Sequence, residues 1–430
     1  MRIFAAIVLI AALIFAYVRI DQRPAWSSFL MSDSVPAEMV ENADKNTSTK
    51  KNLKGESVKN EALSFHTDWV SDSGLASVHA ASSIILQDGK WRAFWFAGSR
   101  EGASDVVIQS ALFDPVNKIW SDMSVVVNRQ TIQKSLGRSI SKIGNPLPVR
   151  ANDGRLQLYF VTVSIGGWAG SSISVIESWD DGVTWGPARR LITSPVFNLS
   201  TLVKAPAFAF QDGTIGLPVY HEWVGKYGEF LRLQTSEHGV ELIDKRRMSS
   251  GRGTLQPIIL IRNQQSADAY FRQARSQGPK KVTASHTVDA GQSWQLGSDL
   301  EVPNPNSAIA GLTLSNQTRL LVLNDLDEGR HRLVMMASWP QNLSDKENTV
   351  LSYGPWRVVQ ILEDDSESTA NTKQEFSYPY LAQSNQGDVL LLYTWNRKRI
   401  REAYFPAAEL RSYLARQALL VPDTMPPEGK

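Results

Sequence analysis

Several stretches of this sequence place charged and aromatic side chains at the ends of apolar runs, where packing alone gives no reason for them. The first follows an apolar run that ends at Gly98, and it contains Arg100, Glu101 and Asp105, with His79 upstream. An arginine beside carboxyl groups could bind a substrate carboxylate while a carboxylic acid transfers a proton. A surface ion pair in a loop would give the same pattern, so both interpretations stay open.

A second group consists of Tyr220, His221 and Glu222, which follow one another directly after an apolar run. In a strand, Tyr220 and Glu222 face one side of the sheet and His221 faces the other. All three reach one site only if the strand has ended there. The group therefore predicts either proton-transfer residues or a structural histidine between two inward-facing side chains.

Arginines recur near the ends of later apolar runs. A planar guanidinium binds a carboxylate in bidentate fashion, which lysine does less well. The candidates for carboxylate binding are Arg252, Arg272, Arg330 and Arg397. The other candidate substrate contacts are Lys204, Gln256, Asn306 and Trp168, whose glycine-rich surroundings would let a sugar face stack on the indole. Solvated loops with structural ion pairs remain the alternative for each of these residues.

Composition excludes some chemistry. The chain has 430 residues, 42% hydrophobic and 20% charged, with a net charge of +2, as in an ordinary globular protein. It contains no cysteine, which excludes disulfides and thiolate chemistry. Its six histidines lack metal-ligand spacing, and no glycine-rich phosphate loop leads from a strand into a helix. We therefore expect no cofactor; a structural calcium ion held by loop carboxylates stays open.

The elements that must position these residues are short apolar runs separated by turn residues, which indicates an all-β repeat. The clearest pattern is Ser-x-Asp-x-Gly-x-Thr-Trp at residues 178–185, with a near copy at residues 287–294. The aspartate can accept backbone N–H bonds across a tight turn, and the glycine takes a conformation that bulkier residues avoid. The tryptophan then fills the layer between sheets. We expect these hairpins on the outer edge of the sheets, so Asp180 and Asp289 are poor catalytic candidates.

The two boxes resemble the Asp-box of the sialidase (neuraminidase)-like family, the BNR/Asp-box repeat β-propeller proteins. Trp120, Trp185, Trp294 and Trp356 lie 65, 109 and 62 residues apart, which corresponds to about one, two and one four-stranded blades. The resemblance implies an all-β fold, a six-bladed β-propeller with seven blades as the alternative. Residues 65–405 would form the propeller, and residues 406–430 a short C-terminal helix and tail.

The resemblance also implies roles for individual residues. Sialidases of this fold hold the sugar carboxylate with three arginines and use a tyrosine nucleophile paired with a glutamate, a known exception to paired carboxylates. By similarity, the arginines would be Arg252, Arg272 and either Arg330 or Arg397. Tyr378 would be the nucleophile, with Glu222 or Glu375 as its base and Asp105 or Glu101 as the acid. The family's early Arg-Ile-Pro motif is absent, and Arg100 stands in the early blade instead.

The N-terminal sequence predicts that the protein is located outside the cytoplasm. Residues 3–18 carry no charge and are flanked by Arg2 and Arg19, which is typical of a signal anchor or a signal peptide within residues 1–20. Residues 21–64 are polar and repeat-free, which predicts a flexible linker. We expect the propeller to be membrane-anchored in the periplasm or outside the cell, or secreted if the segment is cleaved.

Three functions fit these residues. The first is a sialidase-like glycoside hydrolase acting on a carboxylated glycan that contains a sialic-acid-like sugar or a uronate. The second is a polysaccharide lyase in which His79 or His221 with Tyr220 removes a proton beside a carboxylate that an arginine neutralises. The third is a glycan-binding propeller without turnover. Neither nucleic acid nor a nucleotide is an expected partner.

Overall fold

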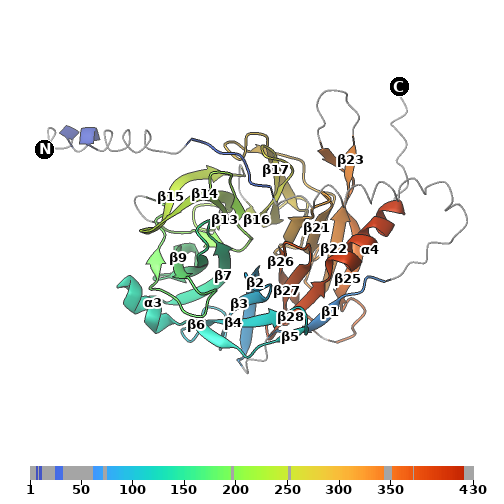
Figure 1. The fold of residues 1–430 in the computed structure, drawn as a ribbon, viewed down its shortest axis with the longest axis horizontal. Coiled ribbons are helices and arrows are strands. Elements are labelled where there is room, and N and C mark those ends of the chain that lie inside the picture. Colours follow the sequence, from blue (N-terminus) through green and yellow to red (C-terminus); the bar gives the residue numbers. More distant parts are fainter. Residues whose placement is uncertain are drawn as a thin grey trace, which may run out of the picture.

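The protein is a six-bladed β-propeller with a C-terminal helix, which confirms the predicted fold with six blades rather than seven. The computed structural model describes residues 6–7, 9–11, 25–31, 62–70, 75–194, 198–249, 253–342, 351–370 and 372–420. Six antiparallel sheets are arranged as blades in a ring around a central axis (Figure 1).

The first three blades follow the chain order, each from an inner strand to an outer one. Blade 1 contains β2 (Ser77–Ile85), β3 (Trp91–Gly98), β4 (Val107–Asp114), β5 (Ile119–Trp120) and β6 (Ser124–Val127). Helix α3 (Arg129–Leu136) connects blade 1 to blade 2. Blade 2 contains β7 (Lys142–Arg150), β8 (Leu156–Val163), η2 (Trp168–Gly170), β9 (Ser171–Ser178) and β10 (Arg189–Arg190). Blade 3 contains β11 (Leu202–Val203), β12 (Phe208–Ala209), β13 (Ile215–His221), β14 (Tyr227–Ser236) and β15 (Gly239–Arg247).

The remaining blades complete the ring. Blade 4 contains β16 (Thr254–Ile261), β17 (Ala267–Gln273), β18 (Thr283–Thr287) and β19 (Gln295–Leu296); blade 5 contains β20 (Ala310–Thr313), β21 (Arg319–Leu323), β22 (Arg332–Ser338) and β25 (Arg357–Asp364), with a side hairpin of β23 (Pro340–Asn342) and β24 (Leu351–Tyr353). Blade 6 contains β26 (Phe376–Gln383), β27 (Val389–Trp395), β28 (Arg399–Phe405) and β1 (His66–Trp69). The predicted terminal helix is α4 (Ala407–Leu419), which buries Leu410 and Leu414.

Two distant parts of the chain close the ring in blade 6. Strand β1 pairs with β28 in antiparallel register, so the outermost strand of the last blade comes from the start of the propeller. The buried carboxylate of Glu402 fixes this junction. It pairs with Nδ1 of His66 at 2.8 Å and accepts a hydrogen bond of 2.8 Å from Nε1 of Trp120 in blade 1. The pairing of β1 with β28 and the contact of Glu402 with Trp120 thus join the last blade to the first part of the propeller chain.

The two Asp boxes form the predicted hairpins, between the third and fourth strands of blades 2 and 4. Asp180 accepts hydrogen bonds from the backbone N–H and the hydroxyl of Thr184 at 2.8 and 2.7 Å, and Asp289 binds Ser293 in the same way. The tryptophans that end the boxes pack against neighbouring blades, with Trp185 making an edge contact to Phe94. The boxes therefore serve as structural staples.

The inner strands share one irregularity. In β2, β7, β16 and β26 the register to the second strand shifts once. At or beside each shift, and at the matching point before β20, one residue that is not glycine has a positive φ, a conformation rare for residues with a Cβ. These residues are Ala80, Asn145, Gln256, Asn306 and Tyr378.

Part of the range predicted to be a flexible polar linker instead packs on the propeller. Residues 25–31 run along blades 3 and 4, where the backbone N–H groups of Phe29 and Leu30 donate to Gln264 and Ala209. Phe29 is fully buried in an aromatic cluster with Phe208, Phe210 and Phe230. The polar composition around this segment concealed two aromatic residues that pack on the propeller, Phe29 and Trp26.

The rest of that linker, residues 32–61 and 21–24, lies outside the described residues. So does most of the predicted anchor at residues 1–20. In the portion of the chain that the structure describes, no helix has the length and apolar character needed to cross a membrane.

A substitution in the docked N-terminal segment tests whether it belongs to the folded domain. Phe29→Ala removes a fully buried ring and should lower the free energy of unfolding by about 3 kcal/mol. Leu30→Ala is the matched control, because Leu30 is 51% exposed and should change stability little. Urea denaturation of both variants measures the difference. Equal stability of the two variants would show that the segment is not docked in solution.

Candidate functional site

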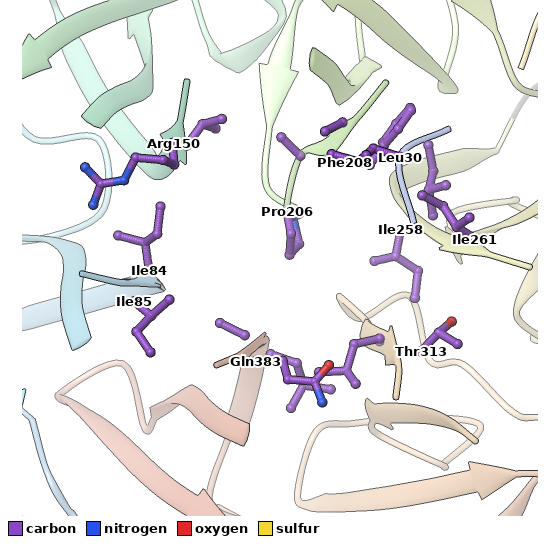
Figure 2. A pocket seen from close by; sticks show the side chains of 18 of the residues that line it. Leu30, Ile84, Ile85, Arg150, Pro206, Phe208, Ile258, Ile261, Thr313 and Gln383 are labelled. Atoms are coloured by element: carbon purple, nitrogen blue, oxygen red, sulfur yellow. The ribbon is translucent and has the colours of Figure 1, made fainter. Parts of the chain in front are cut away.

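The candidate site lies at the end of the central channel where the inner strands begin. The residues with positive φ gather at this end, here called the mouth, together with the loops that follow the second strands. The later halves of the inner strands line a separate cavity of about 780 Å³ toward the opposite end. Figure 2 shows Ile84, Ile85, Pro206 and Ile258 around its open centre, and its walls are largely aliphatic. The polar groups of the channel are thus concentrated at the mouth.

Tyrosine hydroxyls and side-chain amides form the centre of the mouth. The Nε2 group of Gln256 lies 3.3 Å from the hydroxyl of Tyr378 and 3.4 Å from that of Tyr220. The Nδ2 group of Asn145 donates to the carbonyl of Val203 at 3.0 Å and lies 3.4 Å from the Tyr220 hydroxyl. Blades 2, 3, 4 and 6 therefore each contribute one residue to a single polar cluster.

Arg272 extends this cluster toward blade 5. Its Nη1 group donates to Oε1 of Gln256 at 3.1 Å, and its Nε group donates to Oδ1 of Asn306 at 2.8 Å. Both partners are neutral amides. Within the described residues, the Arg272 guanidinium has no carboxylate partner, so its positive charge is not balanced by an ion pair.

Two further arginines share one carboxylate beside Arg272. Arg330 donates to the Asn306 carbonyl at 3.3 Å and to Oε1 of Glu375 at 3.1 Å. Arg397 donates to Oε2 of Glu375 at 3.1 Å and to Oε2 of Glu101 at 2.7 Å. Burial opposes ionisation of Glu375, but the hydrogen bond from Ser377 and the two arginines lower its pKa below the ordinary value. Arg272, Arg330 and Arg397 thus lie along one continuous network.

His79 lies beside Tyr378 with ring centroids 4.1 Å apart. Its Nδ1 atom is 3.0 Å from the hydroxyl of Thr394, and its buried Nε2 atom has no hydrogen-bond partner among the described residues. Burial, followed by the charges of Arg397 and Arg330, holds the pKa of His79 well below its usual range. This imidazole is therefore neutral at neutral pH.

The strand alternation predicted for residues 220–222 is present. Tyr220 points into the mouth, whereas Nε2 of His221 pairs with Glu229 of the neighbouring strand at 2.7 Å. Burial raises the pKa of Glu222 above its ordinary value, opposed by the charges of Arg272 and Lys226. Glu222 is thus a carboxyl group of raised pKa beside Arg272. His221 is separated from the tyrosine with which the lyase interpretation paired it.

The other predicted residues have different surroundings. Arg100 is exposed in the loop after β3, and Asp105 closes the same loop by accepting hydrogen bonds from the backbone and hydroxyl of Ser99. Trp168 packs against Gly144, with the Lys142 ammonium 5.6 Å from its ring. Arg252 lies outside the described residues. Lys204 is buried rather than presented at the mouth surface.

Two members of the network, Asn145 and Thr394, were not among the predicted site residues. Asn145 had a signal, since it precedes a proline in an inner strand as Ala205, Gln256 and Tyr378 do. Proline cannot donate to the ladder and disfavours a helical residue before it, which suits an interrupted strand. Thr394 gave no signal, because it looks like any residue of an apolar strand.

Nothing in the described ranges groups three acidic or histidine side chains in a way that could hold a metal ion. The side chains that the structure places at the mouth offer guanidinium groups, phenols, a neutral imidazole and carboxyl groups.

Comparison with known proteins agrees with this architecture. The family model described as a BNR repeat-like domain matches residues 89–391, more than half of the chain. The protein therefore belongs to the family of sialidase-like BNR-repeat β-propellers, as the Asp boxes indicated. No curated protein matches the chain.

Solved structures share the fold at low sequence identity. A Hadza microbial sialidase, Hz136, is 14% identical with a TM-score of 0.58, over 78% of this chain and 66% of that one. The intramolecular trans-sialidase from Ruminococcus gnavus is 12% identical with a TM-score of 0.60, over 79% and 97%. An α-L-arabinofuranosidase from Fusarium graminearum is 11% identical with a TM-score of 0.52, over 81% and 98%. The fold thus occurs among glycosidases that differ in their sugars.

Glu375 is the carboxylate on which two of the arginines depend. Glu375→Gln removes its charge and should lower the free energy of unfolding at pH 7 by about 1–3 kcal/mol. Because the pKa of Glu375 is lowered in the folded protein, its stabilising effect is complete above the unfolded-state pKa and is lost as the pH falls through the folded-state value. The stability difference between wild type and variant should therefore shrink below about pH 4. Denaturation at pH 7 and pH 3.5 checks this; a constant difference would contradict it.

Proposed function

We propose that the protein is a sialidase-like glycoside hydrolase that acts on a carboxylated glycan at the mouth of the propeller. The observation that carries this proposal is the state of Arg272. Two side-chain amides orient its guanidinium, and no carboxylate of the described residues forms an ion pair with it. A guanidinium oriented in this way suits an incoming carboxylate, which would accept charge-assisted hydrogen bonds from it.

The neighbouring groups suit the rest of a carboxylated sugar. Arg330 lies on the other side of Asn306 and adds positive charge, while the hydroxyls of Tyr220 and Tyr378 supply neutral hydrogen-bond partners. A phenol is a suitable nucleophile next to an anionic substrate, because its neutral form is not repelled by the carboxylate. Tyr378, whose hydroxyl lies 3.3 Å from Gln256, is the phenol assigned this role.

Proton transfer falls to Glu222 in this proposal. Its raised pKa keeps part of the population protonated closer to neutral pH than an ordinary glutamate, as a general acid or base requires. Its charge contributes to raising the pKa of Tyr220, so the two groups are neighbours. Glu101 and Glu375 are already held by arginines and serve mainly to orient them.

Carboxylate recognition is tested by binding. Arg272→Gln should weaken binding of free N-acetylneuraminate or a uronate oligosaccharide at least tenfold, with much less effect on the corresponding methyl ester. Arg100→Gln is the matched control, because Arg100 is exposed in a loop outside the hydrogen-bonded network. Isothermal titration calorimetry measures both ligands. Equal loss for the acid and its ester would contradict a role in carboxylate binding.

A second candidate function, glycan binding without turnover, is favoured by the partner of Tyr378. The hydroxyl of Tyr378 is bonded to the amide of Gln256, and among the described residues no carboxylate hydrogen-bonds to it. A side-chain amide is too weak a base to remove the proton of the phenol. If Glu222 does not take that role, the mouth binds a glycan but does not cleave it.

Two substitutions separate these candidates. In a hydrolase, Tyr378→Phe should lower turnover of acidic glycans about 10²-fold or more and leave binding intact. In a binding protein, the wild type shows no turnover on the same glycans, while Gln256→Glu places a carboxylate beside Tyr378 and should create weak hydrolysis. Product release is followed by chromatography and by ultraviolet absorbance. An unsaturated, ultraviolet-absorbing product that survives Tyr378→Phe would overturn both candidates in favour of a lyase.

A further inference from the structure

Lys204 is a buried cation in the central channel, with 7% of its surface exposed. Its ammonium donates to the carbonyl oxygens of Pro379 and Ile309, the latter at 3.4 Å. Within the described residues it has no carboxylate partner. Its Nζ atom also lies 6.0 Å from the centroid of the Tyr380 ring. Burying a lysine without a carboxylate partner is costly, which argues for a specific role.

The side chain of Lys204 links blades that are not neighbours. Lys204 follows β11 in blade 3, Pro379 belongs to β26 in blade 6, and Ile309 directly precedes β20 in blade 5. Blades 3 and 6 are three positions apart around the ring. Pro206 lies two residues after Lys204, and Tyr380 lies two residues after Tyr378. Both line the aliphatic cavity at the end of the channel opposite the mouth (Figure 2 labels Pro206). Lys204 therefore lies at the level that separates the mouth from this cavity.

Blade 3 differs from the other blades at this level. In those blades a residue with positive φ lies within the inner strand or, in blade 5, before it. In blade 3, residues 204–207, all of them described, contain none, and the residues with positive φ, Asn198 and Ser200, lie before β11. Here the inner strand is broken between β11 and β12, and both pieces pair with β13. The break is where the lysine side chain leaves blade 3.

The carbonyl that Lys204 binds belongs to the residue after Tyr378. Tyr378 has a φ of 54°, a conformation that a bulky residue keeps only when its surroundings hold it. Asn324 fixes the chain before it by donating to the Phe376 carbonyl at 2.9 Å, and Lys204 fixes the chain after it. We propose that Lys204 is a positioning residue, whose ammonium holds the interrupted strand of blade 6 and thereby sets the place of Tyr378 at the mouth.

Among the groups that face one another at this level, Lys204 is the one whose charge changes near neutral pH. His79 from β2 is neutral because burial and nearby cations lower its pKa, and burial raises the pKa of Tyr380 from β26. Arg272 from β17 adds a positive charge. Burial first, and then Arg272, lower the pKa of Lys204 to about 7. The hold on Pro379 should therefore weaken as the pH rises through neutrality.

Two effects of opposite sign follow from this charge. The unfolded chain keeps the Lys204 proton up to its ordinary pKa, so above about pH 7 the unfolded state binds more protons and global stability gains with rising pH relative to Lys204→Met. Where the strand around Tyr378 opens with Lys204 still buried, its local protection should fall over the same range, because the neutral amine is a weaker donor to the Pro379 carbonyl. A merely structural buried lysine would show the first effect without the second.

Hydrogen–deuterium exchange of the full chain tests the proposal without substrate, so the result does not depend on which glycan function is correct. In Lys204→Met, amides of residues 376–382 should exchange about tenfold faster than in wild type at pH 6, while those of residues 389–395 stay unchanged. In wild type, the same amides should lose protection between pH 6 and pH 8.5, after correction for intrinsic exchange, and the variant should lack this change.

Two controls complete the experiment. Lys204→Arg keeps a charged donor and should retain most of the protection of residues 376–382. Lys245→Met removes a lysine on an outer strand that lies 3.6 Å from Glu229, and it should leave these amides as in wild type. Unchanged exchange around Tyr378 in Lys204→Met, or an equal rise in every blade, would overturn the proposal. So would a wild-type protein whose local protection does not vary with pH.

Discussion

The mouth depends on one backbone constraint, the interruption of the inner strands. A regular strand would place successive side chains alternately on the two faces of its blade, where they pack against neighbouring sheets. At the interruptions the chain takes a left-handed conformation, and Asn145, Gln256, Asn306 and Tyr378 turn toward the channel instead. Residues from four blades then meet within hydrogen-bond distance. The site is thus made by breaking the sheets at matching points around the ring.

The same geometry concentrates positive charge, and the chain balances only part of it. Arg330 and Arg397 share Glu375, and Arg397 also binds Glu101. Arg272 and Lys204 are bound by amide and carbonyl oxygens, which solvate a cation without neutralising it. The effect reaches His79, whose pKa is lowered by burial and then by all four cations. Such a site favours an anion and resists protonation of its own histidine.

The sequence allowed the fold to be predicted well because the Asp boxes are local. The central aspartate of each box makes its side-chain bonds within the box, so Asp180 and Asp289 could be assigned to staples from spacing alone. The strand alternation of Tyr220 and His221 was equally local and correct. Contacts of the site span hundreds of residues and depend on where a strand is interrupted. The pairing of Tyr378 with Gln256, and the burial of Lys204 and Phe29, could not be predicted because no local pattern fixes them.

The residues beside Tyr378 differ from those that the resemblance to sialidases implied. Where the resemblance implied an early arginine, the first blade offers His79, kept neutral by its surroundings. Where it implied a glutamate beside the tyrosine, the structure has the amide of Gln256 at 3.3 Å. The side chains of His79 and Gln256 that lie beside Tyr378 are thus both neutral, whereas Arg272 binds the other end of the Gln256 amide. The proposed recognition of an anion by Arg272 and the proposed activation of the Tyr378 phenol therefore rest on different groups of this mouth.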